Sequence, residues 1–358
     1  MFAENGKISL RQLQVLLLLD SFGTAVLFLP SELAQVSGRS CWIVALVGGL
    51  IFVLASFLLV KAGEKRDNVT EWCRASFGKG LGTVLLLGLA VKMLLEGSLE
   101  LYIFSEIICR NMLPHTPVWV LSLVILLVAG MLAFQGIESR GRTAEILFFL
   151  VLIPLAVVLT AVALSAEYGR IRPLALPSIA DVWQGIFSVS IVFQGLTFLY
   201  FVPPYLQKKS SRKVAVSSFI TVLTIAAIVF LCLAVYGEGI LSEKLLPTLQ
   251  MLERVSFTGI FLTRQDVLLL WFWMASVCIF LSGIVFYGAV LMADIFRRQE
   301  QKRWRGLWLA GLFFLTFLPQ DLSVAYRFRL QFLPWLQLFY LLVLPCVLLV
   351  KKGGRSDV

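Results

Sequence analysis

Ten stretches of mostly apolar residues follow one another along this 358-residue chain. An α-helix of about 20 such residues crosses the hydrocarbon core of a bilayer. Charged residues make up only 15% of the chain, against about 25% in soluble domains. We therefore predict an all-α integral membrane protein with ten transmembrane helices in a single transmembrane domain, residues 1–358. The predicted spans cover residues 9–36, 41–60, 82–109, 118–135, 144–165, 180–206, 213–236, 266–296, 305–320 and 330–350.

The basic residues are divided unevenly between the two sides of the predicted bundle. With the N-terminus inside, 21 of the 31 Lys and Arg residues fall on the inner side, Arg140 among them, and nine fall on the outer side, Arg329 among them. Cytoplasmic loops of membrane proteins carry such an excess, so we place both termini in the cytoplasm. The net charge of +10 therefore follows from membrane topology and does not call for a nucleic-acid partner.

The first and sixth predicted spans share one pattern, in which polar residues and a glycine interrupt the apolar run and an apolar half-helix then ends in proline. The two stretches read LLLLDSFGTAVLFLP and SVSIVFQGLTFLYFVPP, and their glycines, Gly23 and Gly195, lie 172 positions apart. Matched broken helices in two halves of a chain indicate an inverted-repeat transporter fold with its site at the midplane. We predict a 5+5 inverted repeat over about residues 9–165 and 180–350. The alternative is ordinary kinked helices, since glycine is common in membrane spans.

A helix broken within the bilayer exposes backbone groups that no water can satisfy. The start of the second half-helix presents N–H groups and a positive dipole end, which suit an anionic ligand group. We predict that residues 21–25 clasp an α-carboxylate and that carbonyl groups of the second break accept from an α-ammonium. The predicted ligand-binding residues of the two breaks are Asp20, Ser21, Phe22, Gly23, Thr24, Ala25, Phe193, Gln194, Gly195 and Leu196.

Asp20 admits two interpretations. As a carboxylate within the bilayer it is a candidate counter-ion for an amine or a cation. As an Asp at the start of a half-helix it also suits the role of an N-cap, because its side-chain oxygens accept from backbone N–H groups. The sequence leaves both open.

The third predicted span carries Lys92, Glu96 and Glu100 at successive i+4 positions, hence on one helix face. Each charge costs about 2.5–3.5 kcal/mol at the centre of a membrane, so all three must pair or face a polar cavity. They are our candidates for an ion or proton path. We predict a Lys92–Glu96 pair, which leaves Glu100 as the better candidate for a ligand or proton contact. The alternative is a purely structural network between helices.

Several short strings resemble the spore-germinant receptor B-subunit family, the spore permeases of the amino acid, polyamine and organocation superfamily. They are GTAVLFLP, SFGKGLG, RPLALP, the outer-loop string PTLQMLERVSFTGIFLTRQD and FLPQDL. The resemblance implies a leucine-transporter-type fold and a three-component receptor in the inner membrane of dormant bacterial spores. In such a receptor the ten-span subunit recognises a nutrient, often an amino acid, and an A-like membrane subunit and a C-like lipoprotein are its partners.

The resemblance also implies further site residues. In a leucine-transporter-type fold the eighth span faces the break in the first, which adds Ser282 and Tyr287 to the predicted ligand-binding residues. Glu100 matches a family glutamate in the third span. Arg264 and Asp266 lie in the most specific string. Either they pair and anchor an outer lid over the site, or they contribute little because both are exposed charges.

Three functions are compatible with the sequence. The first is a nutrient-sensing receptor subunit that triggers spore germination, the second is an amino-acid or cation symporter on the same fold, and the third is an ion or water conduit gated by partners. An enzyme is not expected, because no set of nucleophile, base and orienting group is visible. The six cysteines form no C-x-x-C pair and the only histidine is His115, so we predict neither a metal nor a cofactor.

Overall fold

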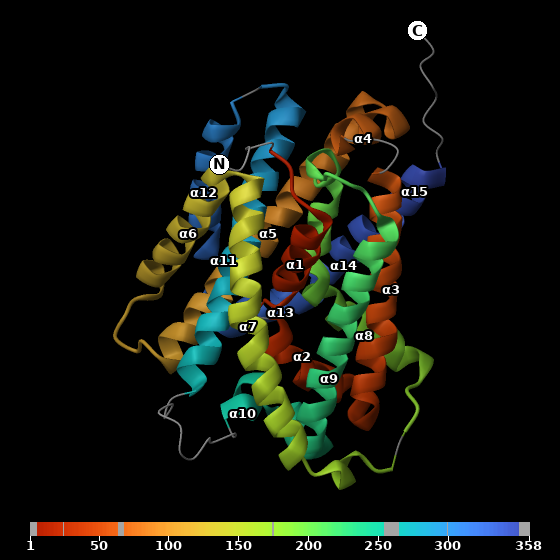
Figure 1. Ribbon diagram of the computed structural model, residues 1–358, viewed down its shortest axis with the longest axis vertical. Coiled ribbons are helices and arrows are strands. Elements are labelled where there is room, and N and C mark those ends of the chain that lie inside the picture. Colours follow the sequence, from red (N-terminus) through yellow and green to blue (C-terminus); the bar gives the residue numbers. More distant parts are fainter. Residues whose placement is uncertain are drawn as a thin grey trace.

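The computed structural model describes residues 6–23, 25–63, 68–173, 175–253, 265–298 and 300–350, and side chains within them except those of residues 151, 253 and 265–272. These residues form an all-helical bundle (Figure 1). The α-helices are α1 Leu10–Ser21, α2 Ala25–Ser37, α3 Cys41–Gly63, α4 Val69–Phe77, α5 Lys79–Asn111, α6 Val118–Gln135, α7 Ile137–Ser165, α8 Ile179–Ser190, α9 Ser211–Glu243, α10 Pro247–Glu253, α11 Gln265–Phe296, α12 Gln301–Thr316, α13 Leu322–Gln331, α14 Leu333–Leu338 and α15 Leu344–Val350. Four 3-10 segments, η1 Gly38–Ser40, η2 Tyr168–Ile171, η3 Ile191–Tyr200 and η4 Pro203–Tyr205, and a π-helical turn, η5 Phe339–Val343, complete the chain order.

This is an all-helical, multi-span membrane protein. Seven helical segments of the described residues are long and apolar enough to cross a bilayer. They are Ala25–Gly63, which joins α2 to α3, and Val118–Gln135, Ile137–Ser165, Ile179–Tyr200, Ser211–Glu243, Trp273–Phe296 and Leu322–Val350. The other predicted spans correspond to helices that are interrupted, charged or short. These are α1, which ends at Ser21, α5, which carries three central charges, and α12, which has 16 residues.

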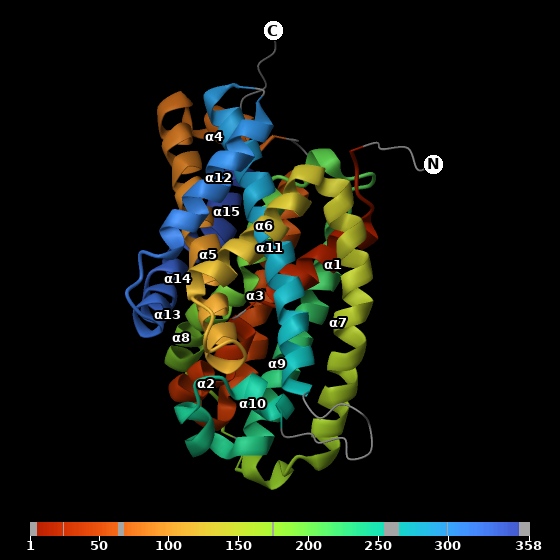
Figure 2. The same cartoon turned by 90° about the vertical axis from the view of Figure 1, so that its left-hand side faces the viewer.

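The two ends of the bundle differ. The segment that leads into α1 and the last turn of α15 lie toward the end of the molecule that also holds α4 and the start of α12 (Figure 2). We call this the α4 end and the opposite one, with α10 and the last turn of α2, the α10 end (Figure 1). Helix α11 is the most buried of the candidate spans and packs against α5, α6 and α12, whereas α7 is the least buried. The charged inner stretch 61–80 predicts a short amphipathic helix at the membrane interface, with Trp72 and Phe77 facing lipid. This helix is α4, but Trp72 is buried in the protein.

The first predicted span is broken where expected. Helix α1 stops at Ser21, Phe22 leaves helical geometry with φ −86° and ψ 44°, and α2 starts at Ala25. The prediction that the second half-helix ends at Pro30 is wrong, because α2 continues through this proline to Ser37.

Pro30 has no N–H to give to the carbonyl of Val26, four residues earlier. The hydroxyl of Thr248 on α10 replaces the missing donor and donates to that carbonyl at 2.8 Å. Thr248 is fully buried, so no water competes for the bond. A side chain from a distant helix thus compensates for the proline that α2 contains.

We expect Thr248→Val to lower the free energy of unfolding by about 1–3 kcal/mol, because the buried carbonyl of Val26 then has no donor. Thermal unfolding in detergent micelles measures the effect. Thr224→Val is the matched control, since the Thr224 hydroxyl is exposed and bonds within its own helix to Ile220. Equal melting temperatures for the two variants would show that the Thr248 bond does not compensate for Pro30.

The sixth predicted span is also irregular. Helix α8 passes at Ser190 into the 3-10 segment η3, where Phe193 has non-helical angles of φ −91° and ψ 20°. The segment ends close to Pro203, which begins η4. A Cβ atom on Gly195 would lie 2.5 Å from the Cβ of Asp20 and 3.3 Å from its backbone carbon. The second irregular segment therefore touches the first break directly, and glycine permits the contact.

Candidate binding site

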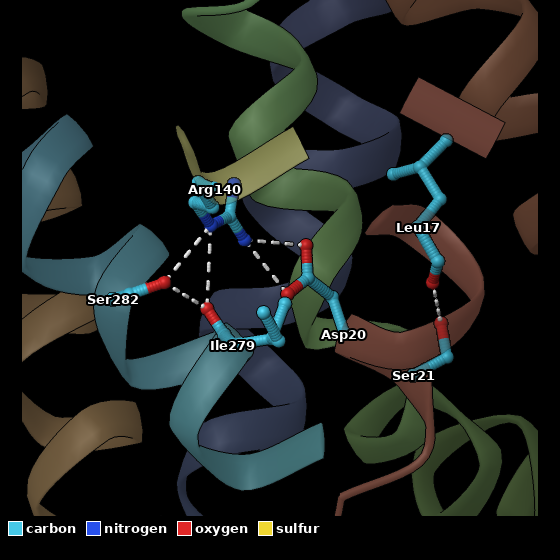
Figure 3. Close-up of polar contacts among 6 residues, drawn as sticks. All are labelled: Leu17, Asp20, Ser21, Arg140, Ile279 and Ser282. Atoms are coloured by element: carbon cyan, nitrogen blue, oxygen red, sulfur yellow. Dashed lines mark hydrogen bonds and ion pairs between the residues drawn. The ribbon is translucent and has the colours of Figure 1, made fainter. Parts of the chain in front are cut away.

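The carboxylate of Asp20 is held by Arg140 (Figure 3). One terminal guanidinium nitrogen donates to both carboxylate oxygens, at 2.8 and 2.9 Å, and each side chain is 1% exposed. The topology prediction counts Arg140 among the basic residues of the inner side, and the structure buries it in the protein, in the first turn of α7. Asp20 lies in the last turn of α1, and its carboxylate is paired with a cation of the protein itself. Breaking such a buried pair leaves an uncompensated charge.

Arg140 also contacts residues of α11 and η3. Its Nε donates to the Ser282 hydroxyl at 3.1 Å and to the Ile279 carbonyl at 3.3 Å (Figure 3). The guanidinium carbon lies 5.2 Å from the ring centre of Phe198 and 5.5 Å from that of Tyr287. A carboxylate, a hydroxyl and a carbonyl are oxygen groups that suit a cation. In this structure the cation among these oxygen groups is the guanidinium of Arg140, and the predicted ligand residues Ser282 and Tyr287 lie next to it.

Glu100 lies between the two breaks. Gln194 donates to its Oε2 at 3.2 Å, and Arg329 donates to the same oxygen at 2.5 Å. A Cβ atom on Gly23 would lie 2.6 Å from Glu100 Oε1. The topology prediction put Arg329 on the outer side, but α13 directs it into the protein, where it is 2% exposed. Glu100 thus contacts both predicted breaks and is paired with a cation.

The predicted Lys92–Glu96 pair is present. Lys92 Nζ lies 2.8 Å from Glu96 Oε1, and both side chains are buried. Lys92 also donates to the hydroxyl of Thr197 at 2.8 Å. Since Thr197 belongs to η3, this pair is bound to the irregular segment as well.

The three ion pairs form one buried cluster of three carboxylates and three cations around η3. We call it the charge cluster. It consists of Asp20, Lys92, Glu96, Glu100, Arg140 and Arg329, each at most 3% exposed. Its formal charges cancel, which limits the cost of keeping them away from water.

The structure describes most of the other predicted site residues. Phe22, Phe193 and Leu196 are buried apolar side chains at the breaks, and Ala25 begins α2. The Ser21 hydroxyl donates to the Leu17 carbonyl of its own helix at 2.8 Å (Figure 3). The Gly23 carbonyl accepts from the indole of Trp273 at 3.3 Å. Thr24 and Arg264 lie outside the described residues, as does the side chain of Asp266, so the lid pair stays a prediction.

The sequence did hold a signal for the two arginines that we missed. The middles of the predicted spans contain three carboxylates, Asp20, Glu96 and Glu100, but only one cation, Lys92. Charges within a membrane need partners, so two basic residues near span ends had to turn inward. Nothing in the sequence indicated which two.

The chain matches known spore germination proteins. The model of the spore permease family, which is described as spore germination protein, matches residues 7–324. Spore germination protein YndE of Bacillus subtilis strain 168 is 23% identical over 99% of each chain. Spore germination protein B2 of the same strain is 24% identical over 88% of each chain.

A solved transporter has a similar structure. This is Mhp1, a nucleobase-cation-symport-1 family transporter, solved in a closed conformation with bromovinylhydantoin bound. The TM-score is 0.70 at 13% sequence identity, and the alignment covers 96% of this chain and 77% of Mhp1. At this identity the likeness shows the fold alone.

Proposed function

The chain belongs to the spore permease family of spore germination proteins, and we propose that it is the membrane subunit of a spore nutrient-germinant receptor. In this proposal it binds a small nutrient, an amino acid in the first instance, between its two broken helices. Binding triggers germination together with an A-like membrane subunit and a C-like lipoprotein. The protein then resides in the spore inner membrane with both termini in the cytoplasm, and it has no enzymatic role.

We also propose ten spans in a 5+5 inverted repeat within one transmembrane domain. Two features support this arrangement. First, the interruptions at Gly23 and Gly195 are about half a chain apart. Second, α5 and α12 can serve as further spans, although the charges of α5 and the short length of α12 exclude them from the seven apolar segments. The 33 residues of α5 are enough to cross a bilayer.

One observation carries the functional proposal, namely the direct contact of the two breaks beside the charge cluster. Gly195 packs on Asp20, and Glu100 lies between Gly23 and Gln194. A helix that begins in mid-membrane offers N–H groups of its first turn to a ligand carboxylate. The start of α2 is such a place, and the η3 backbone across from it offers carbonyl groups to an ammonium group. A zwitterionic amino acid matches both.

The role of Asp20 in this proposal is narrower than the sequence suggested. Arg140 neutralises its carboxylate, and neither a ligand amine nor the start of α2 is needed to explain its position. We therefore assign Asp20 to holding the end of α1 in place. Lys92, Glu96 and Glu100 each have a partner of opposite charge. The proposal that this helix face conducts ions or water therefore gains no support.

The test is a ligand screen on the purified protein. We expect at least one proteinogenic amino acid to raise its melting temperature in detergent micelles in a saturable way, because a ligand that binds only the folded state stabilises it. The same amino acid should trigger germination of spores that carry the wild-type chain with its partner subunits. A screen without any stabilising amino acid, repeated in a complex with the partner subunits, would contradict amino-acid recognition.

A symporter is the second candidate, because a fold like that of this chain occurs in a solved cation-symport transporter. Uptake of labelled amino acid by proteoliposomes separates the two functions. A receptor subunit should bind the amino acid and leave it equilibrated across the membrane. Accumulation against a gradient would show transport and contradict a sensor alone.

A further inference from the structure

A cavity lies away from the breaks, at the α4 end of the molecule. Its volume is about 900 Å³, and residues of α4, the start of α5, the end of α11 and the start of α12 line it. Six charged side chains contribute to the lining. The cations are Arg74, Lys79, Arg297 and Arg298, and the acids are Glu71 and Asp294.

The cations of the lining exceed its acids, and three of the four cations have no ion pair with another described residue. Asp294 accepts a hydrogen bond from Asn68 and faces Arg74, whose guanidinium donates to the Ile295 carbonyl at 2.9 Å. Within the part of the chain that the structure describes, Lys79, Arg297 and Arg298 have no carboxylate at ion-pair distance. Three free cations around one cavity attract an anion of more than one charge.

Arg297 has an unusual backbone conformation for its residue type. It follows α11 with φ +54°, in the left-handed region, and the next N–H, of Arg298, bonds back to the Ala293 carbonyl at 3.0 Å. Glycine normally takes this position after a helix because a side chain there is strained. An arginine therefore lowers the stability of this helix end. The guanidinium that it brings to the cavity is a reason for its presence.

A neutral group of the lining also lacks a partner. The hydroxyl of Thr70, in the first turn of α4, is buried and has no hydrogen-bond partner among the described residues. The preceding Asn68 caps α4 by accepting from the Thr70 N–H at 2.8 Å. The cavity thus combines free cations with an unused hydroxyl beside a helix start, where anions are favoured.

We propose that this cavity binds a phosphate-bearing anion, either a phospholipid headgroup or a soluble phosphate. Arginine side chains bind phosphate oxygens with paired N–H donors. The volume far exceeds that of a single chloride ion. Basic pockets at the cytoplasmic ends of membrane helices accept such groups, and the positive-inside distribution puts the α4 end in the cytoplasm. The site is separate from the breaks and does not depend on their function.

The experiment compares two double variants of the full chain, Arg297→Gly/Arg298→Ala and Lys208→Ala/Arg212→Ala. Both remove two positive charges from the predicted cytoplasmic side, but Lys208 and Arg212 are exposed residues that do not line the cavity. Glycine at position 297 also relieves the backbone strain, so the first variant should remain folded. Melting temperatures are measured in detergent with inorganic phosphate against chloride of equal ionic strength. They are measured again in phosphatidylcholine nanodiscs with and without phosphatidylglycerol.

We expect phosphate or phosphatidylglycerol to stabilise the wild type and the Lys208/Arg212 variant. The Arg297/Arg298 variant should lose about tenfold in apparent affinity, as expected when charge-assisted hydrogen bonds are removed. A response to inorganic phosphate identifies a soluble anion, and a response to phosphatidylglycerol alone identifies a lipid headgroup. Equal losses in both double variants would reduce the effect to general surface charge and overturn the site. A wild type that responds to neither probe would overturn it as well.

Discussion

Replacing Arg140 with methionine is expected to lower the free energy of unfolding by about 3–5 kcal/mol. The substitution leaves the carboxylate of Asp20 buried without a cation, and loss of one partner of a buried ion pair has an effect of this size. The change also removes the bonds to Ser282 and Ile279 that join α7 to α11. Thermal or denaturant unfolding in detergent micelles measures it.

Two further variants isolate the ion pair as the cause. The double variant Arg140→Met/Asp20→Asn should recover a large part of the loss, because the orphaned charge is then gone. Arg142→Met is the matched control on the same helix, since Arg142 is half exposed and lies 3.6 Å from its partner Glu138. A surface pair of this kind contributes at most about 1 kcal/mol. A double variant that is no more stable than Arg140→Met would contradict our account of the pair.

Gly195→Ala is expected to displace the two breaks from each other and to abolish ligand binding. The added methyl group would lie 2.5 Å from the Cβ of Asp20 and 3.3 Å from its backbone carbon, so no side-chain rotation relieves the contact. Overpacking in a close-packed site typically costs about 1–3 kcal/mol. The free energy of unfolding and the affinity for the amino acid found in the screen should therefore fall together.

Gly306→Ala is the matched control for this substitution. Gly306 lies in α12, and a Cβ atom there would meet nothing within 4 Å. Alanine in a helix is more favourable than glycine by up to about 1 kcal/mol, so this variant should be as stable as the wild type or more so. If Gly195→Ala has the same affinity for the amino acid and the same free energy of unfolding as Gly306→Ala, the contact between the breaks is not needed for binding.

The sequence was sufficient to predict the features that follow from local pattern. Polar residues and a glycine inside an apolar run predicted where α1 ends and where η3 becomes irregular. The i+4 spacing of Lys92 and Glu96 predicted their ion pair. In each case the cause is local, because the lipid environment excludes unpaired charge and unsatisfied backbone wherever they occur.

Features that depend on distant parts of the chain could not be predicted in this way. Arg140 and Arg329 flank apolar runs just as surface residues do, and only the packing of α7 and α13 turns them inward. Pro30 was predicted to end a half-helix, but Thr248, more than 200 residues later, supplies the donor that lets α2 continue. Trp72 is buried because α4 folds back on the start of α5, not because of its own position in a short amphipathic pattern.

The central claim is that a nutrient binds where the two broken helices meet. Equilibrium binding of the labelled amino acid found in the screen, to purified Gly23→Ala, Gly195→Ala and Gly306→Ala variants that retain their fold, tests it most directly. A methyl group at Gly23 would lie 2.6 Å from Glu100 Oε1, at the opposite side of the same site. We predict that Gly306→Ala binds like the wild type and that the other two variants lose binding. Unchanged affinity in both Gly23→Ala and Gly195→Ala would contradict a binding site at the breaks.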